Sequence, residues 1–211
     1  MSEFRGKLIA GFGLPGSGKS SVMAELARQC GWESFFEPEE GEWARAVRDR
    51  KQCGYFTALT WFRAARVPLL YEADRLRRAG AISVMDSYYD KLVVKYLGKK
   101  GMEWLLPPDD PYFNLAFSMA EMDYATLPDC DCLVYFQVDR ETWCQYLSRR
   151  NRMFDKENPL IDSYCTADVF KYAAEEYCKE KNIPLLVFEN KVSTPKDAAI
   201  SLRNAMGEYL A

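Results

Sequence analysis

A glycine-rich segment near the start of the chain, residues 13–20, limits the possible folds more than any other part of the sequence. It reads Gly-Leu-Pro-Gly-Ser-Gly-Lys-Ser and matches the phosphate-binding pattern G-x-x-x-x-G-K-[ST]. An apolar run over residues 7–11 precedes it, and apolar residues at helical spacing over 20–30 follow it. Glycine lets the backbone turn so that its N–H groups point toward phosphate oxygens. The segment therefore predicts a strand, a loop and a helix that bind a nucleoside triphosphate.

The residues of this loop have separate expected roles. Lys19 supplies a positive charge for the β- and γ-phosphates, and the hydroxyl of Ser20 is a ligand for Mg²⁺. A nucleoside triphosphate and Mg²⁺ are therefore the expected cofactors. We expect the rest of the loop to hold the phosphates through Gly13, Pro15, Gly16, Ser17 and Gly18.

Segments typical of strands and of helices alternate along the chain. Further short apolar runs lie at residues 33–36, 81–85, 132–138 and 185–188, and helical patterns lie at 55–79, 87–97, 114–125, 140–150 and 162–181. Thr194, Pro195 and Asp197 mark the start of a last helix. This alternation predicts one α/β domain over residues 1–211, a three-layer P-loop sandwich. Its five-stranded parallel sheet should have helices on both faces.

Composition argues against several classes of protein. The 28 basic and 31 acidic residues give a net charge of −3, so we expect no nucleic-acid partner. No apolar run reaches the roughly 18 residues of a membrane span, and the N-terminus does not resemble a signal peptide. The absence of histidine excludes a histidine general base. Seven cysteines without a C-x-x-C motif indicate reduced thiols and a cytoplasmic protein.

Charged residues follow three of the predicted elements. Glu37 follows the second strand and Asp86 follows the third, so both should lie at the edge of the sheet where ligands bind. Glu37 can accept a proton from an acceptor hydroxyl, or it can be one solvated acid among several. Asp86 can hold Mg²⁺. Arg149, Arg150 and Arg152 can close over a triphosphate, or simply complement a helix C-terminus.

Three more segments carry a resemblance to known proteins. They are Glu37-Pro38 followed by Trp43, Phe56-Thr57 followed by Arg66, and Arg150-Asn151-Arg152 followed by Asp155 and Pro159-Leu160. Together with the phosphate loop, they resemble the deoxyribonucleoside kinases, within the superfamily that includes thymidylate kinase. The resemblance covers most of the chain.

The resemblance implies an activity, ATP-dependent phosphorylation of the 5′-hydroxyl of a (deoxy)nucleoside in nucleoside salvage. It implies Glu37 as the general base, and Lys19, Arg150 and Arg152 as further catalytic residues. A lid region would span about 149–160, with Arg149 near the donor. Asp155 would bind the sugar 3′-hydroxyl. A homodimer formed through two long helices would also fit this family.

The acceptor pocket should draw on aromatic and basic side chains. Trp43, Tyr55 and Tyr88 can stack on a base or pack against a sugar, and Arg66 can bond to a base edge. For each aromatic residue the alternative is ordinary core packing. For Arg66 the alternative is an ion pair with a neighbouring helix.

The sequence departs from the family at two places. Leu59 occupies the position of the family's base-reading glutamine, and Asp86-Ser87-Tyr88 resembles the Asp-Arg-Tyr of thymidylate kinases without its arginine. A nucleoside monophosphate is therefore an alternative acceptor, with Arg45 and Arg48 as candidates for its phosphate. A GTPase is a weaker alternative, because residues 190–193 match only half of N-K-x-D. A non-catalytic nucleotide-binding protein is the last alternative.

Overall fold

The computed structural model describes residues 6–150, 152, 164–191 and 194–207. Five strands form one sheet in the order β2-β3-β1-β4-β5, and every pair of neighbours is parallel. The strands are β1 (Lys7–Gly13), β2 (Glu33–Phe35), β3 (Ile82–Met85), β4 (Cys132–Gln137) and β5 (Leu185–Glu189). All strands therefore end at the same edge of the sheet. The predicted five-stranded parallel sheet is confirmed.

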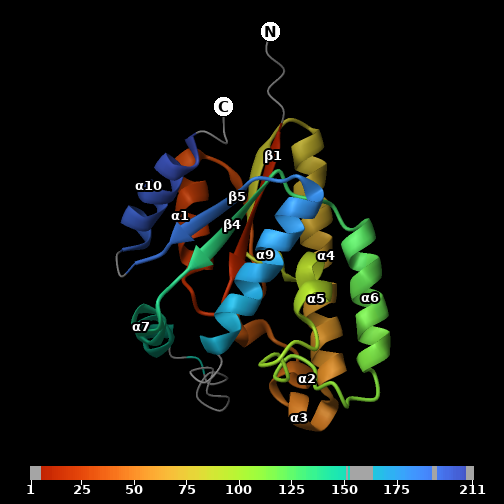
Figure 1. Ribbon diagram of the computed structural model, residues 1–211. Coiled ribbons are helices and arrows are strands. Elements are labelled where there is room, and N and C mark those ends of the chain that lie inside the picture. The colour runs from red at the N-terminus through yellow and green to blue at the C-terminus, as the bar shows by residue number, and fades with distance from the viewer. Residues whose placement is uncertain (1–5, 151, 153–163, 192–193, 208–211) are drawn as a thin grey trace.

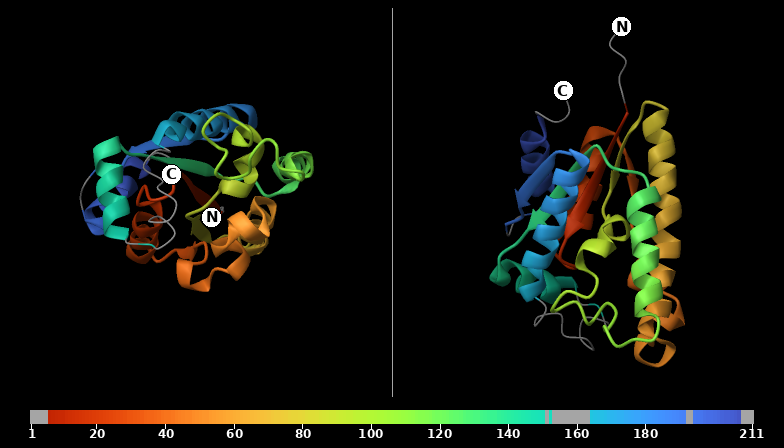
Figure 2. Two further views of the ribbon diagram at one scale, coloured as in Figure 1. Left: turned by 90° about the horizontal axis from the view of Figure 1, so that it is seen from below. Right: turned by 45° about the vertical axis from the view of Figure 1, so that its right-hand side comes forward.

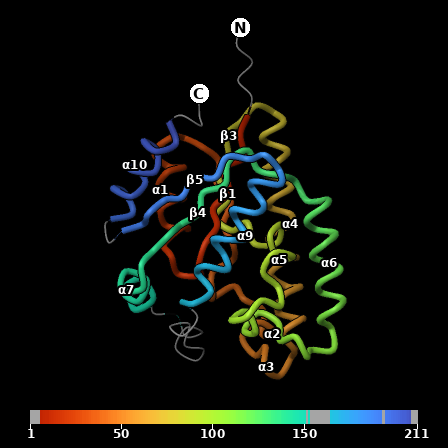
Figure 3. Tube along the Cα trace, viewed as in Figure 1, coloured from red at the N-terminus to blue at the C-terminus, as the bar shows by residue number. Residues whose placement is uncertain are grey.

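Helices cover both faces of the sheet (Figure 1). One face packs against α1 (Lys19–Cys30) and α10 (Pro195–Ala205), and the other against α4 (Tyr55–Arg78), α5 (Tyr89–Tyr96) and α9 (Ala167–Lys181). Helix α6 (Phe113–Thr126) packs against α5 at the outside of this second layer (Figure 2). Helix α7 (Arg140–Arg150) lies beyond the end of β4, as the tube in Figure 3 shows. The predicted α/β sandwich with helices on both faces is confirmed.

Two apolar cores lie on opposite sides of the sheet. The larger one, below α4, α5 and α9, centres on Phe12, whose ring contacts the rings of Tyr89, Tyr96 and Phe170. The smaller one joins the sheet to α1 and α10. Because β1 is central and almost completely buried, the phosphate loop that follows it starts from a fixed point.

The segment between β2 and α4 contains short helices that the sequence pattern did not predict. They are a 3₁₀ helix (Glu40–Glu42), α2 (Arg45–Arg48) and α3 (Arg50–Cys53). Each is about one turn long, too short to show helical periodicity. In the part of the chain that the structure describes, no helix has the length and apolar character that crossing a bilayer requires.

Candidate active site

The phosphate loop connects β1 to α1 and depends on glycine at two positions. Gly16 and Gly18 both have φ of 82°, in the left-handed region of backbone conformation, which residues other than glycine rarely adopt. A Cβ atom on Gly16 would lie 2.6 Å from Leu147 Cδ2, and one on Gly18 would lie 2.7 Å from Asn190 Nδ2. The loop therefore keeps its curvature only with glycine at both places.

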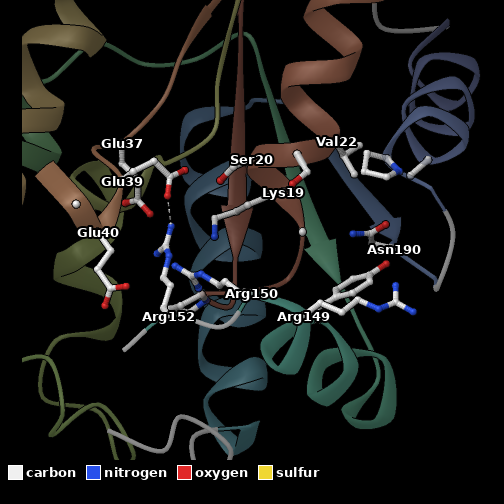
Figure 4. A pocket seen from close by; sticks show the side chains of 18 residues that line it. Lys19, Ser20, Val22, Glu37, Glu39, Glu40, Arg149, Arg150, Arg152 and Asn190 are labelled. Carbon is white, nitrogen blue, oxygen red and sulfur yellow. Dashed lines mark hydrogen bonds and ion pairs between the residues drawn. The ribbon is translucent and has the colours of Figure 1, made fainter. Parts of the chain in front are cut away.

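Lys19 begins α1, and its ammonium group bends back toward the loop. Its Nζ donates a hydrogen bond to the carbonyl of Leu14 at 3.2 Å and lies 5.1 Å from the ring centre of Tyr89. Burial lowers the pKa of Lys19, and the negative charges of Glu37 and Asp86 partly offset this effect. Lys19 and Glu37 both line the cavity that Figure 4 shows.

Asp86 follows β3 and lies almost completely buried beside the start of α1. Its Oδ1 accepts a hydrogen bond from the backbone N–H of Glu37 at 3.2 Å. Burial and the charge of Glu37 raise the pKa of Asp86 to about 6, although Ser20 and Lys19 favour its charged form. Among the described residues its Oδ2 has no hydrogen-bond partner.

The oxygen atoms of Asp86 and Ser20 suit a small divalent cation. Mg²⁺ prefers oxygen ligands and is typically held by one or two protein side chains together with phosphate oxygens. The unpartnered Oδ2 of Asp86 is such a ligand, and Ser20 lines the same cavity as Lys19. These residues therefore fit the expected Mg²⁺.

Three arginines border the phosphate cavity, a cleft of 620 Å³ over the phosphate loop (Figure 4). Arg149, Arg150 and Arg152 come from the end of α7 and the residues after it. Arg152 Nη2 pairs with Glu39 Oε2 at 2.8 Å, and its guanidinium lies 5.6 Å from the ring centre of Trp43. The rest of the predicted lid, including Asp155, lies outside the described residues.

A second hollow, the apolar pocket, adjoins the phosphate cavity and has a volume of 120 Å³. Its walls include Trp43, Leu59, Phe62, Tyr89, Tyr96 and Trp104. Four residues line both hollows: Pro15, Glu37, Arg150 and Arg152. A molecule in the apolar pocket would therefore meet a phosphate chain at Glu37.

Arg66 forms the buried polar floor of the apolar pocket. Its Nε and Nη2 donate to both carboxylate oxygens of Asp90, at 2.8 and 3.1 Å, and its Nη1 donates to Glu37 Oε2 at 3.3 Å. Burial alone would lower the pKa of Arg66, but Asp90 and Glu37 raise it above its usual range. Arg66 is thus a permanent cation that fixes the carboxylate of Glu37.

The structure places most predicted site residues around the two hollows, with exceptions. The expected pocket role of Tyr88 is corrected: it lines neither hollow, its ring is buried in the larger core, and its hydroxyl donates to the carbonyl of Pro128 at 2.7 Å. Its neighbour Tyr89 lines the pocket instead. Tyr55 stacks beside Arg50, which lines the pocket, but is not itself among the lining residues. Gly13 and Ser17 shape the loop from behind the cavity.

Asp90, Arg50 and Asn190 belong to the site and were missed. Asp90 stands four residues after Asp86, but this spacing gave no reason to pair it with Arg66. Arg50 took part in no sequence pattern, and Asn190 was noticed only as the first residue of the half-match to N-K-x-D. Arg45 and Arg48, the candidates for an acceptor phosphate, are exposed and line neither hollow.

Comparison with known proteins gives matches in structure only. No protein-family model and no curated protein matches the sequence. The deoxyadenosine kinase from M. mycoides with bound dATP is 21% identical, with 94% of this chain and 98% of that chain covered and a TM-score of 0.69. The same enzyme with products dCMP and a flexible dCDP bound is 19% identical, covers 95% and 99%, and has a TM-score of 0.66.

Thymidylate kinase from Candida albicans is similar to the same extent. It is 17% identical, with 98% of this chain and 94% of that chain covered and a TM-score of 0.65. At these identities the similarity establishes the fold, which is the P-loop kinase fold of deoxynucleoside and thymidylate kinases. The predicted resemblance is therefore confirmed at the level of the fold.

The raised pKa of Asp86 predicts a pH-dependent loss of stability in the ligand-free protein. Above about pH 4 the unfolded chain ionises this carboxyl, whereas the folded protein keeps the proton until about pH 6. The free energy of unfolding should therefore fall across this window, by up to about 3 kcal/mol. Asp86→Asn should remove the loss and be the more stable protein at pH 8. Urea unfolding at pH 4, 6 and 8 measures it.

The exposed Asp109 offers a matched control for this measurement. Asp109→Asn should follow the parent protein at every pH. If Asp86→Asn also runs parallel to the parent from pH 4 to pH 8, Asp86 does not titrate in this window and its burial carries no such cost.

Proposed function

We propose that this chain transfers the γ-phosphoryl group of ATP to the 5′-hydroxyl of a nucleoside or deoxynucleoside. The observation that carries the proposal is the junction of the two hollows. Glu37, Arg150 and Arg152 line both the phosphate cavity and the apolar pocket. A carboxylate and two cations at this junction are what phosphoryl transfer to a hydroxyl requires.

The phosphate cavity supplies groups for each part of the donor. The loop backbone and Lys19 bind the β- and γ-phosphates, and Arg149 lies at the far end of the cavity. Ser20 and Asp86 would hold Mg²⁺, which when bound neutralises phosphate charge and orients the γ-phosphoryl group. Arg150 and Arg152 stabilise the charge that develops on the transferred group.

Glu37 is placed to act as the general base. Arg66 and Asp86 hold it from two sides, through its Oε2 and its backbone N–H. The acceptor oxygen bonds to the γ-phosphorus while the bond from this phosphorus to the bridging oxygen of ADP breaks. The hydroxyl proton passes to the carboxylate of Glu37.

The apolar pocket suits a nucleoside better than a more highly charged acceptor. Trp43, Phe62 and Tyr89 provide ring surfaces, and Leu59 adds an apolar wall. The fold is similar to that of a deoxyadenosine kinase with bound dATP, and this similarity covers nearly the whole of both chains. It supports this assignment. The similarity to thymidylate kinase supports phosphoryl transfer to a nucleotide as the second candidate.

One observation favours the second candidate, a nucleoside monophosphate kinase. Arg50 lines the apolar pocket, beside the ring of Tyr55, and is half-buried. A cation in this place can bind an acceptor phosphate, a role once expected of Arg45 and Arg48. The distinction between the two candidates therefore depends on the acceptor.

A panel of acceptors tests the two candidates against each other. We expect ATP and Mg²⁺ to phosphorylate one or more nucleosides or deoxynucleosides and no monophosphate. Product formation by thin-layer chromatography or mass spectrometry measures it. Turnover of monophosphates alone, lost in Arg50→Gln, would establish the second candidate. ATP binding without turnover of any acceptor would indicate a non-catalytic protein.

The base assignment predicts a separation of binding from turnover. Glu37→Gln keeps the size of the side chain and removes its basicity, so kcat should fall about 100-fold or more. ATP affinity should change little, because the phosphates bind to the loop and Lys19. Steady-state kinetics and calorimetric ATP titration give the two quantities.

Two variants frame this result. Glu33→Gln, on the exposed edge strand, should behave as the parent protein. Lys19→Ala should lose both ATP affinity and turnover. A kcat of Glu37→Gln within twofold of the parent would exclude Glu37 as the base.

We also propose a homodimer formed through the outer faces of α4 and α6, which lie side by side in Figures 1 and 2. Tyr71, Leu115 and Met122 are about half exposed there, and Leu115 and Met122 lie seven residues apart on one face of α6. Sedimentation should show a dimer that the double variant Leu115→Glu, Met122→Glu converts to a monomer. A monomeric parent protein would refute this surface as an interface.

A further inference from the structure

Tyr89 contacts both parts of the site with one side chain. It is the first residue of α5, and it lines the apolar pocket. Its hydroxyl donates a hydrogen bond to the carbonyl of Gly13 at 2.8 Å, where β1 passes into the phosphate loop. Burial raises the pKa of Tyr89 well above its usual range, so the hydroxyl keeps its proton and remains a donor.

The bond to Gly13 orients the first peptide group of the phosphate loop. The carbonyl and the N–H of a trans peptide point in opposite directions, so the N–H of Leu14 is turned away from Tyr89. Trp143 and Asn190 bond to later carbonyls of the loop, those of Pro15 and Ser17. Of these three donors, Tyr89 is the one that also lines the apolar pocket.

The ring of Tyr89 also lies beside a cation from each part of the site. Lys19 Nζ is 5.1 Å from the ring centre, and the guanidinium carbon of Arg66 is 5.4 Å from it. Cations at such distances are attracted to the face of an aromatic ring. The rings of Phe12 and Phe170 pack edge-on against Tyr89, at 5.5 and 6.0 Å between centres, and hold it in place. The ring therefore stands between the lysine of the phosphate loop and the arginine that fixes Glu37.

We propose that Tyr89 is a positioning residue for the phosphoryl donor, which holds the phosphate loop and Lys19 in place from within the wall of the acceptor pocket. This inference rests on the proposed function, because that function assigns ATP to the loop and the acceptor to the apolar pocket. The hydroxyl of Tyr89 then serves the donor alone, whereas its ring serves both substrates. Two variants separate these roles, since Tyr89→Phe removes only the hydroxyl and Tyr89→Leu removes the ring as well.

Titration with ATP and Mg²⁺ tests the role of the hydroxyl without any acceptor. The Kd of ATP should rise about 5-fold in Tyr89→Phe, the effect of losing one hydrogen bond that orients the loop. Isothermal titration calorimetry on the full chain measures it. Tyr88→Phe is the matched control, because Tyr88 is the preceding residue, is 1% exposed and donates to the carbonyl of Pro128. Both variants should lose stability in urea, but Tyr88→Phe should bind ATP within about twofold of the parent protein.

Steady-state kinetics test the division between the substrates, with the nucleoside that the parent protein phosphorylates fastest. Tyr89→Phe should raise the KM for ATP about 5-fold and leave the KM for the nucleoside within about twofold, because the ring remains. Tyr89→Leu should raise the KM for the nucleoside about 5-fold as well.

Three results would overturn the inference. One is an ATP affinity of Tyr89→Phe within twofold of the parent protein. Another is an equal loss of ATP affinity in Tyr88→Phe, which would make the effect one of general stability. The third is a higher KM for the nucleoside alone in Tyr89→Phe, which would assign the hydroxyl to the acceptor.

Failure of the proposed function gives a different pattern. If the parent protein binds ATP but phosphorylates no nucleoside, the proposed function fails, and weaker ATP binding in Tyr89→Phe alone still supports the positioning of the loop. If the parent protein does not bind ATP, both proposals are overturned.

Discussion

The phosphate loop has its shape because side chains from three separate elements bond to its outward carbonyls. Tyr89 of α5 donates to Gly13, Trp143 of α7 donates to Pro15, and Asn190 after β5 donates to Ser17. A peptide group whose carbonyl is bound outward presents its N–H inward. The loop is therefore preorganised for an anion by the layers that surround it. A change in α5, α7 or the end of β5 reaches the loop through one of these bonds.

The charges around the loop depend on one another in the same way. The charge of Glu37 lies close enough to Lys19 and Asp86 to raise the pKa of both groups. Burial raises the pKa of Asp86 to about 6 and lowers the pKa of Lys19. A triphosphate and a divalent cation would supply the opposite charge for each. Burial thus disfavours the charged form of both groups, and a bound anion and cation would favour it.

The sequence was sufficient to predict the elements that carry this site, but not which side chains line its pockets. The loop, the five strands and Glu37 and Asp86 follow from local patterns, because each depends on neighbours in the chain. Tyr88 and Tyr89 show the limit. Adjacent residues on a helix point about 100° apart, so the choice between them depends on where α5 begins against the sheet. The ion pair of Arg66 with Asp90 could not be predicted either, because Asp90 lies 24 residues away on another helix.

The lining of the apolar pocket constrains how an acceptor base is recognised. Leu59 has no polar group, and Arg66 directs three of its N–H groups to Asp90 and Glu37. If Arg66 turned toward a base edge, it would break a buried ion pair and release Glu37 from its position. Arg66 is therefore poorly suited to hydrogen-bond a base. Ring stacking on Phe62 and Tyr89 tolerates any base. In the proposed reaction, recognition of an acceptor base would therefore depend more on the shape of the pocket than on specific hydrogen bonds.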